Sequence, residues 1–155
     1  MSEKRFEIHP KKFEIHERPN RFEITKVRYA PDTFLSEVKQ IQGGGLAVER
    51  EEDLDRLVEA PLLEACKILY RKGIQTVFSS ANRADIARGF AYIVVDVDSL
   101  AESNKETALR MGDMAMLHGS VERPGIWLKI PVNDHTTFGD VETSAIEIAN
   151  RFEQQ

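Results

Sequence analysis

Two short polar segments, residues 79–85 and 133–137, carry the side chains best suited to bind a ligand. Their candidate binding residues are Ser79, Ser80, Asn82, Arg83, His135, Thr136 and Thr137. Hydroxyls, an amide, a guanidinium and an imidazole beside the start of a helix suit a carboxylate or a phosphate group. The sequence therefore predicts a site for a small anionic ligand. The same residue types also serve ordinary turns and helix caps, and that alternative stays open.

Catalysis is indicated less clearly than binding. Ser80, Asp134 and His135 could form a nucleophilic arrangement, but no Gly-x-Ser-x-Gly turn frames either serine of the first segment. We therefore expect a protein that binds rather than one that catalyses, and a small hydrolase or transferase using His135 is the third hypothesis.

Metal ligands do not form a recognisable pattern. Asp96 and Asp98 share one face of a strand and would suit Mg²⁺ if a third oxygen ligand were near, but we interpret Asp98 as a helix cap. The chain has four histidines and a single cysteine, Cys66, without the paired spacing of a zinc site. Cys66 falls on an apolar helix face and is interpreted as a core thiol. We expect no metal and no cofactor.

The elements that position the two polar segments follow from hydrophobic periodicity. Apolar residues recur every three or four positions over residues 51–72, which predicts a helix that Pro61 kinks or splits. Residues 75–80 and 91–97 read as two strands of an antiparallel hairpin. A capping-box pattern from Ser99 to Glu102 predicts a helix through Met111, followed by a strand and a final helix over residues 125–132 and 140–153.

This order of elements predicts an α+β fold. A further strand at residues 21–29 would complete a two-layer, ferredoxin-like sandwich, in which a split βαβ antiparallel sheet carries helices on one face. We expect the carboxyl ends of the strands at residues 75–80 and 125–132 to emerge on the same side of the domain. The two polar segments would then face each other. Residues 111–116, with Met111, Met114 and Met116 around Gly112, are interpreted as core filling or a mobile cover.

The N-terminal residues form a repeat. Arg5–His9, Lys12–His16 and Arg21–Thr25 each read basic, Phe, Glu, Ile, polar, which is the alternation of a strand. Pro10 and Pro19 exclude one continuous helix. The copies could form a meander, one ordered strand with two loose copies, or a disordered tail, and we favour the second. We expect residues 1–20 to be a strand-like or flexible arm and residues 21–155 a single domain.

Composition narrows the partners. Residues 1–28 contain eight Lys and Arg against five Glu, whereas the whole chain has a net charge of −5, so the remainder is acidic and nucleic acid is not an expected partner. No stretch reaches the roughly 18 apolar residues of a membrane helix, so no membrane partner is expected. Cytoplasmic location is the expectation from one cysteine and no apolar N-terminal run.

In outline, Leu62 to Leu109 resembles the small-molecule-sensing ACT domains. The resemblance consists of a helix, Lys72-Gly73-Ile74, a strand, a loop, a strand and a helix. The loop after the first strand, with which those domains contact ligands, has no counterpart in this chain, and we do not assign the chain to them.

Two functions are therefore expected ahead of catalysis. The first is a non-catalytic binding or regulatory domain for a small ligand or a protein. The second is a self-assembly module, for example a dimer, in which the arm adds strands to the sheet edge of a neighbour.

Overall fold

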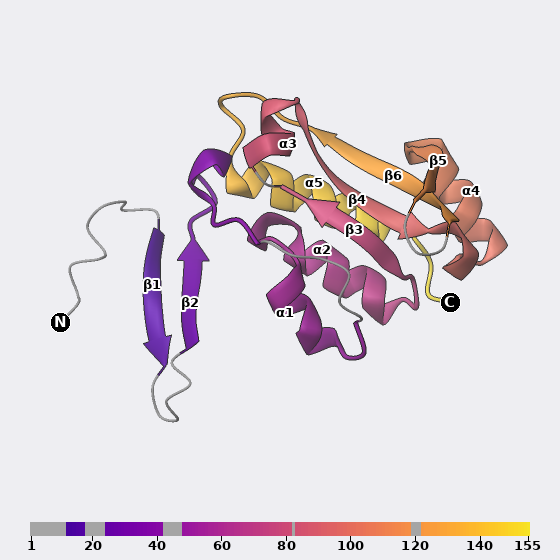
Figure 1. The fold of residues 1–155 in the computed structure, drawn as a ribbon, viewed down its shortest axis with the longest axis horizontal. Coiled ribbons are helices and arrows are strands. Elements are labelled where there is room, and N and C mark those ends of the chain that lie inside the picture. The colour runs from indigo at the N-terminus through magenta and orange to yellow at the C-terminus, as the bar shows by residue number, and fades with distance from the viewer. Residues whose placement is uncertain (1–11, 18–23, 42–47, 82, 119–121) are drawn as a thin grey trace.

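The computed structural model describes residues 12–17, 24–41, 48–81, 83–118 and 122–155 (Figure 1). It confirms an α+β fold built on a four-stranded antiparallel sheet with helices. The strands are β3 (Thr76–Ser80), β4 (Phe90–Asp96), β5 (Asp113–Leu117) and β6 (Arg123–Pro131), in the order β3-β4-β6-β5. Because β6 is antiparallel to both β4 and β5, those two strands are parallel to each other with β6 between them.

The helices lie where the apolar periodicity places them. They are α1 (Leu54–Leu57), α2 (Ala60–Arg71), α3 (Arg83–Ala87), α4 (Glu102–Met111) and α5 (Phe138–Asn150), with 3-10 segments η2 (Leu35–Glu37), η3 (Glu51–Asp53) and η4 (Val97–Ser99). The predicted helix over residues 51–72 is split, because Pro61 stands in the first turn of α2, where its missing N–H leaves no bond unmade. Gly73 adopts φ 83°, a left-handed conformation that ends α2.

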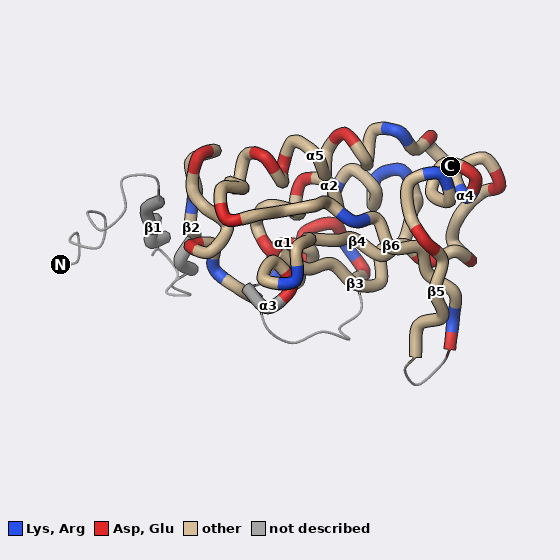
Figure 2. Tube along the Cα trace, turned by 90° about the horizontal axis from the view of Figure 1, so that it is seen from above, with Lys and Arg blue, Asp and Glu red and all other residues tan. Residues whose placement is uncertain are grey.

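One face of the sheet is covered by the long helices. Figure 2 shows α2, α5 and α4 on the same side of the strands, and α2 packs against α5. The strand residues that face them are fully buried: Ala91, Ile93, Val95, Ile126, Leu128 and Ile130. At the ends of the two packed helices, Lys72 Nζ donates to the backbone oxygens of Ala149 and Phe152, at 3.1 and 2.6 Å.

The opposite face carries the alternate residues of the central strands. Tyr92 pairs with Lys129, Phe90 with Pro131 and Val94 with Trp127 in the β4–β6 register. We call the surface formed by Phe90, Tyr92, Trp127 and Lys129 the open face; Val94 lies on the same side of β4 but is fully buried. No long helix of the described chain lies on this side in Figure 2.

The expectation that residues 21–29 supply the first strand of the main sheet is wrong. Strand β2 (Ile24–Tyr29) does not join the four-stranded sheet, but pairs antiparallel with β1 (Lys12–Glu17) in a separate two-stranded sheet (Figure 1). The preference for one ordered repeat copy is also wrong, since β1 is the second copy. Pairing of β1 with β2 is favoured over pairing of β2 with the main sheet, because two strand-like segments that are close in sequence lose little entropy when they pair, whereas joining the sheet needs long-range contacts. The first copy lies outside the described residues, as does the proposed boundary at residue 20.

Two local expectations are also corrected. Residues 113–117 form the edge strand β5, with Met114 and Met116 46% and 51% exposed, so they do not fill the core. Ser99 does not cap α4. It ends η4, where its Oγ donates to Asp96 O at 2.8 Å, and the N–H of Ala101, the residue before α4, is accepted by Gln155 Oε1.

None of the helices in the described residues is long and apolar enough to cross a membrane.

Candidate functional site

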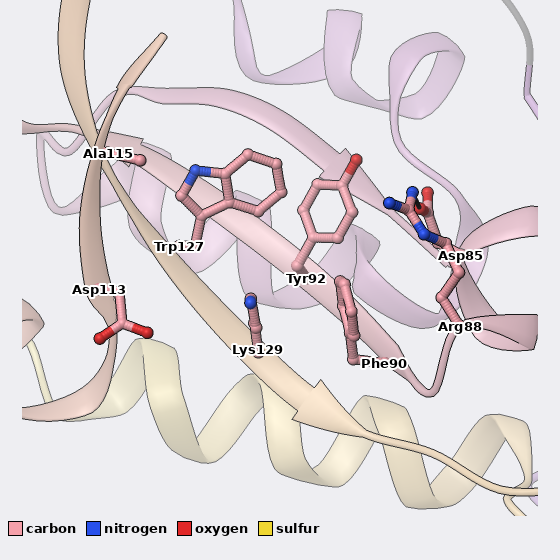
Figure 3. A pocket seen from close by; sticks show the side chains of 8 residues that line it. All are labelled: Asp85, Arg88, Phe90, Tyr92, Asp113, Ala115, Trp127 and Lys129. Carbon is pink, nitrogen blue, oxygen red and sulfur yellow. Dashed lines mark hydrogen bonds and ion pairs between the residues drawn. The ribbon is translucent and has the colours of Figure 1, made fainter.

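A cavity of about 360 Å³ lies over the open face. It is lined by Asp85, Arg88, Phe90, Tyr92, Asp113, Ala115, Trp127 and Lys129, which come from α3 and the turn after it and from β4, β5 and β6. Figure 3 shows the aromatic rings of the central strands side by side, with the lysine amine among them and the arginine at one end. The volume falls within the range of small-molecule sites, roughly 300–1,000 Å³.

The floor of the cavity is aromatic. The ring centroids of Tyr92 and Trp127 are 4.6 Å apart with their planes inclined by 48°, and those of Phe90 and Tyr92 are 6.0 Å apart. Lys129 Nζ lies 4.8 Å from the Phe90 ring centroid, a cation–π distance. All three rings are only half-buried. A further flat ring could therefore stack on this floor, since aromatic pairs gain most from offset or tilted contact.

A buried polar chain supports one end of the cavity. Ser80 Oγ donates to Asp85 Oδ2 at 2.5 Å, and the Tyr92 hydroxyl is hydrogen-bonded to the Ser80 side chain. Burial, and then the charge of Asp85, raises the pKa of Tyr92, which keeps this phenol protonated. Arg88 Nη1 lies 3.4 Å from Asp85 Oδ1. The chain of bonds fixes Tyr92 and holds the guanidinium at the cavity rim.

A second buried carboxylate ties the layers together beneath this site. Glu59, 4% exposed, accepts the backbone N–H groups of Ala81 at 2.6 Å and Ile41 at 3.1 Å. Burial raises its pKa, the two backbone bonds lower it, and the nearby Asp85 carboxylate raises it further. Glu59 therefore anchors the residue that links β3 to α3.

The first predicted segment is divided between the two faces of the sheet. Ser79 is hydrogen-bonded to the Cys66 thiol on the helix side, whereas Ser80 reaches Tyr92 and Asp85 on the other side. Asn82 and the side chain of Arg83 lie outside the described residues. The segment therefore contributes Asp85 to the cavity, whereas Ser79 and Ser80 do not line it; Arg88, which does, lies beyond the segment.

The second predicted segment does not line the cavity. Its residues bond mainly among themselves and with residues 31–35: Asn133 Oδ1 accepts the His135 N–H at 2.8 Å, and Thr136 Oγ1 accepts the Asn133 N–H. Thr137 caps α5 in a capping box with Asp140. The carboxyl ends of β3 and β6 do point the same way, as predicted, but backbone bonds from Leu35 to Thr136 and from Phe138 to Thr33 put residues 33–35 against the second segment.

The remaining predicted residues have structural partners. Cys66 is buried, which confirms the core-thiol interpretation, and burial raises its pKa to about 12. Asp96 rather than Asp98 caps η4, accepting the Asp98 N–H, and it also accepts from Arg123 Nη1 at 3.1 Å. Over the described ranges, no group of three His, Cys, Asp or Glu could hold a metal ion.

The sequence contained a signal for the cavity that polar motifs did not reveal. Phe90 and Tyr92 alternate on β4, and Trp127 and Lys129 alternate on β6. Both strands are apolar on both faces, although the long helices cover only one. Apolar side chains on an uncovered face mark a binding surface.

No protein-family model matches the chain, and comparison with curated proteins and with solved structures gives no match either.

Proposed function

We propose that this chain is a non-catalytic domain that binds a small ligand on the open face of its sheet. The observation that carries the proposal is the cavity over Tyr92 and Trp127, with a floor of half-buried rings and charged groups at its rim. Ligand sites are commonly concave, largely apolar and equipped with a few placed polar groups. The rigid Tyr92–Ser80–Asp85 chain supports such a site because it holds the aromatic floor in place before any ligand arrives.

The proposal is tested by filling the cavity. Ala115 lines it from the edge strand, so Ala115→Phe should occupy the space without disturbing the core. The matched control is Met116→Phe, one residue along on β5, which is 51% exposed and does not line the cavity. A chemically diverse fragment set is screened by ¹H–¹⁵N NMR. The chain has one tryptophan, so Trp127 gives a single indole N–H signal that needs no further assignment.

We expect some fragments to shift the Trp127 indole signal in the wild type and in Met116→Phe, but at least tenfold more weakly in Ala115→Phe. The proposal is abandoned if no fragment of any chemical class shifts this signal, or if Ala115→Phe binds as the wild type does.

Catalysis receives less support from the arrangement. The Ser80 hydroxyl is buried and bonded to Asp85, and the His135 segment is bonded within itself and to residues 33–35. His135 does not line the cavity, and no serine or cysteine side chain of the described residues is hydrogen-bonded to its imidazole.

Self-assembly is a second candidate, favoured by the separate two-stranded sheet. An isolated pair of strands is marginally stable in water, and its outer edges offer unpaired N–H and C=O groups. β1 and β2 pair only with each other among the described strands. Deleting residues 1–19 should lower the number of chains per particle, as light scattering measures it in solution. An unchanged number of chains would remove this candidate.

We also propose that the fold is a ferredoxin-like sandwich with altered connections. In the split βαβ plan the first strand lies between the third and the fourth. Here β6 takes that inner place and β5 the place of the fourth strand, while α4 connects the parallel strands β4 and β5 across β6. An experimental structure in which residues 24–29 pair with β4 instead of β6 would contradict this arrangement.

A further inference from the structure

We infer that the cavity on the open face takes a planar aromatic ligand carrying one anionic group, with its ring against Tyr92 and Trp127 and its anion beside Lys129. The inference rests on the proposed function and names the ligand class for the same site.

The ring is required by the shape and chemistry of the floor. Tyr92 and Trp127 incline their rings by 48° at a centroid distance of 4.6 Å, and both are half-buried, so each offers part of a ring to a ligand. A flat π-system gains dispersion and quadrupole contact from such a floor, which a saturated ring of similar size does not.

The anion follows from the balance of charge around the cavity. Two cations and two carboxylates line it, but they are not equivalent. Arg88 and the buried Asp85 are already paired at 3.4 Å, and Asp85 also accepts from Ser80. Lys129 is exposed, and no carboxylate within the described residues forms an ion pair with it; its amine lies over the Phe90 ring. Lys129 is therefore the cation with a charge left to offer.

Asp113 also lines the cavity and would favour a cationic ligand instead. The positions of its carboxylate and of the Lys129 amine favour the anion. Asp113 lies on β5 across from Trp127 and is exposed. Figure 3 shows its carboxylate directed away from the rings, whereas the Lys129 amine lies among them. A ligand stacked on the floor would meet the amine first. An aromatic cation, drawn by Asp113, would have to approach Lys129 as well and would be repelled.

A strand of nucleic acid would use a similar aromatic floor but needs more charge. Single strands are held by grooves in which cations follow the phosphates, and binding scales with their number. Arg88 and Lys129 are the cations that line this cavity, beside two carboxylates. This balance fits one anionic group and not a phosphate backbone.

The test uses probes that separate ring from charge. 2-Naphthoate carries both, 2-naphthamide keeps the ring and shape without charge, 2-naphthylmethylamine reverses the charge, and decalin-2-carboxylate keeps the charge without the π-system. Each is titrated into the full chain while the Trp127 indole N–H signal is followed. Lys129→Met is the test variant, and Lys105→Met on α4, outside the cavity, is its matched control.

We expect 2-naphthoate to bind about fivefold more tightly than 2-naphthamide, the upper end for one exposed ion pair, and tighter than the other two probes. In Lys129→Met the ratio of naphthoate to naphthamide affinity should fall to about one, with naphthamide itself unchanged, whereas Lys105→Met should keep the wild-type ratio.

Equal affinity for naphthoate and naphthamide in the wild type would overturn the anion, and equal affinity for naphthoate and decalin-2-carboxylate would overturn the ring. Preference for the naphthylmethylamine would assign the site to cations instead. In each of these cases the cavity still binds a ligand and the proposed function stands. If none of the four probes binds, the inference fails, while the diverse fragment screen decides the proposed function separately.

Discussion

Glu59 should be the most sensitive polar position in the domain, because one buried carboxylate satisfies two backbone donors from different segments. Replacing it with alanine leaves the N–H groups of Ala81 and Ile41 without their acceptor. A fully buried donor left unsatisfied costs about 1–3 kcal/mol. Ala81 is buried, so it bears that full cost, whereas Ile41 is half-exposed and water can replace part of its bond.

Together we expect Glu59→Ala to lower the free energy of unfolding by about 2–4 kcal/mol, a large share of the roughly 5–15 kcal/mol typical of a domain. Each kcal/mol corresponds to about 2–4 °C in melting temperature for a domain of this size. Urea unfolding followed by far-ultraviolet circular dichroism measures the change. The matched control is Glu64→Ala on α2, the helix that follows Glu59; Glu64 is exposed, its Oε2 lies 3.7 Å from Arg71 Nη1, and its loss should cost less than about 1 kcal/mol.

The pH dependence gives a second readout of Glu59. Because burial raises its pKa above the ordinary value of 4.5, the folded protein holds this proton more tightly than the unfolded chain does. The stabilisation is complete below about pH 4.5 and is lost as the pH rises through the folded pKa. Glu59→Gln has no such proton, so its stability should change less over that window. The reasoning is refuted if Glu59→Ala costs no more than Glu64→Ala, or if Glu59→Gln keeps the wild-type slope.

Three further predictions concern other parts of the domain. A Cβ at Gly112 would overlap the Trp127 carbonyl oxygen, so Gly112→Ala should displace β5 and cost about 1–3 kcal/mol in urea unfolding; wild-type stability would show that the strand yields freely. Because Cys66 is buried and its pKa is raised to about 12, iodoacetamide should modify it only in denaturant, as mass spectrometry can measure. Because His135 does not line the cavity, His135→Ala should leave fragment binding at the Trp127 indole signal unchanged, and weaker binding would place the second polar segment in the site.

The parts of the fold that could be predicted from the sequence are those encoded locally. Pro61 and Gly73 mark the start and end of α2 through their own backbone chemistry, and the β3–β4 hairpin joins neighbouring segments. The position of β6 between β4 and β5 depends on long-range pairing, which periodicity does not report. The short strand β5 was missed because Met114 and Met116 are apolar yet exposed, so their pattern resembles core residues.

The candidate site shows the same division. Polar residues in turns were recognised because their chemistry is visible one residue at a time, and Thr137 is an example whose hydroxyl serves only as a helix cap among the bonds the structure describes. The aromatic floor needs two facts together: that Tyr92 and Trp127 share a face, and that their strands are neighbours. The face on which each ring lies can be predicted from the alternation within its strand, whereas the pairing of the two strands is known only from the folded sheet.

The place of β6 has a consequence for how the chain is made. A central strand that comes late in sequence leaves β4 with one unpaired edge and two apolar faces until residues 123–131 have left the ribosome. At synthesis rates of about 5–20 residues per second, that exposure lasts on the order of seconds. During this interval the nascent chain presents the edge and apolar surface that chaperones recognise, and slow codons between β5 and β6 would lengthen it.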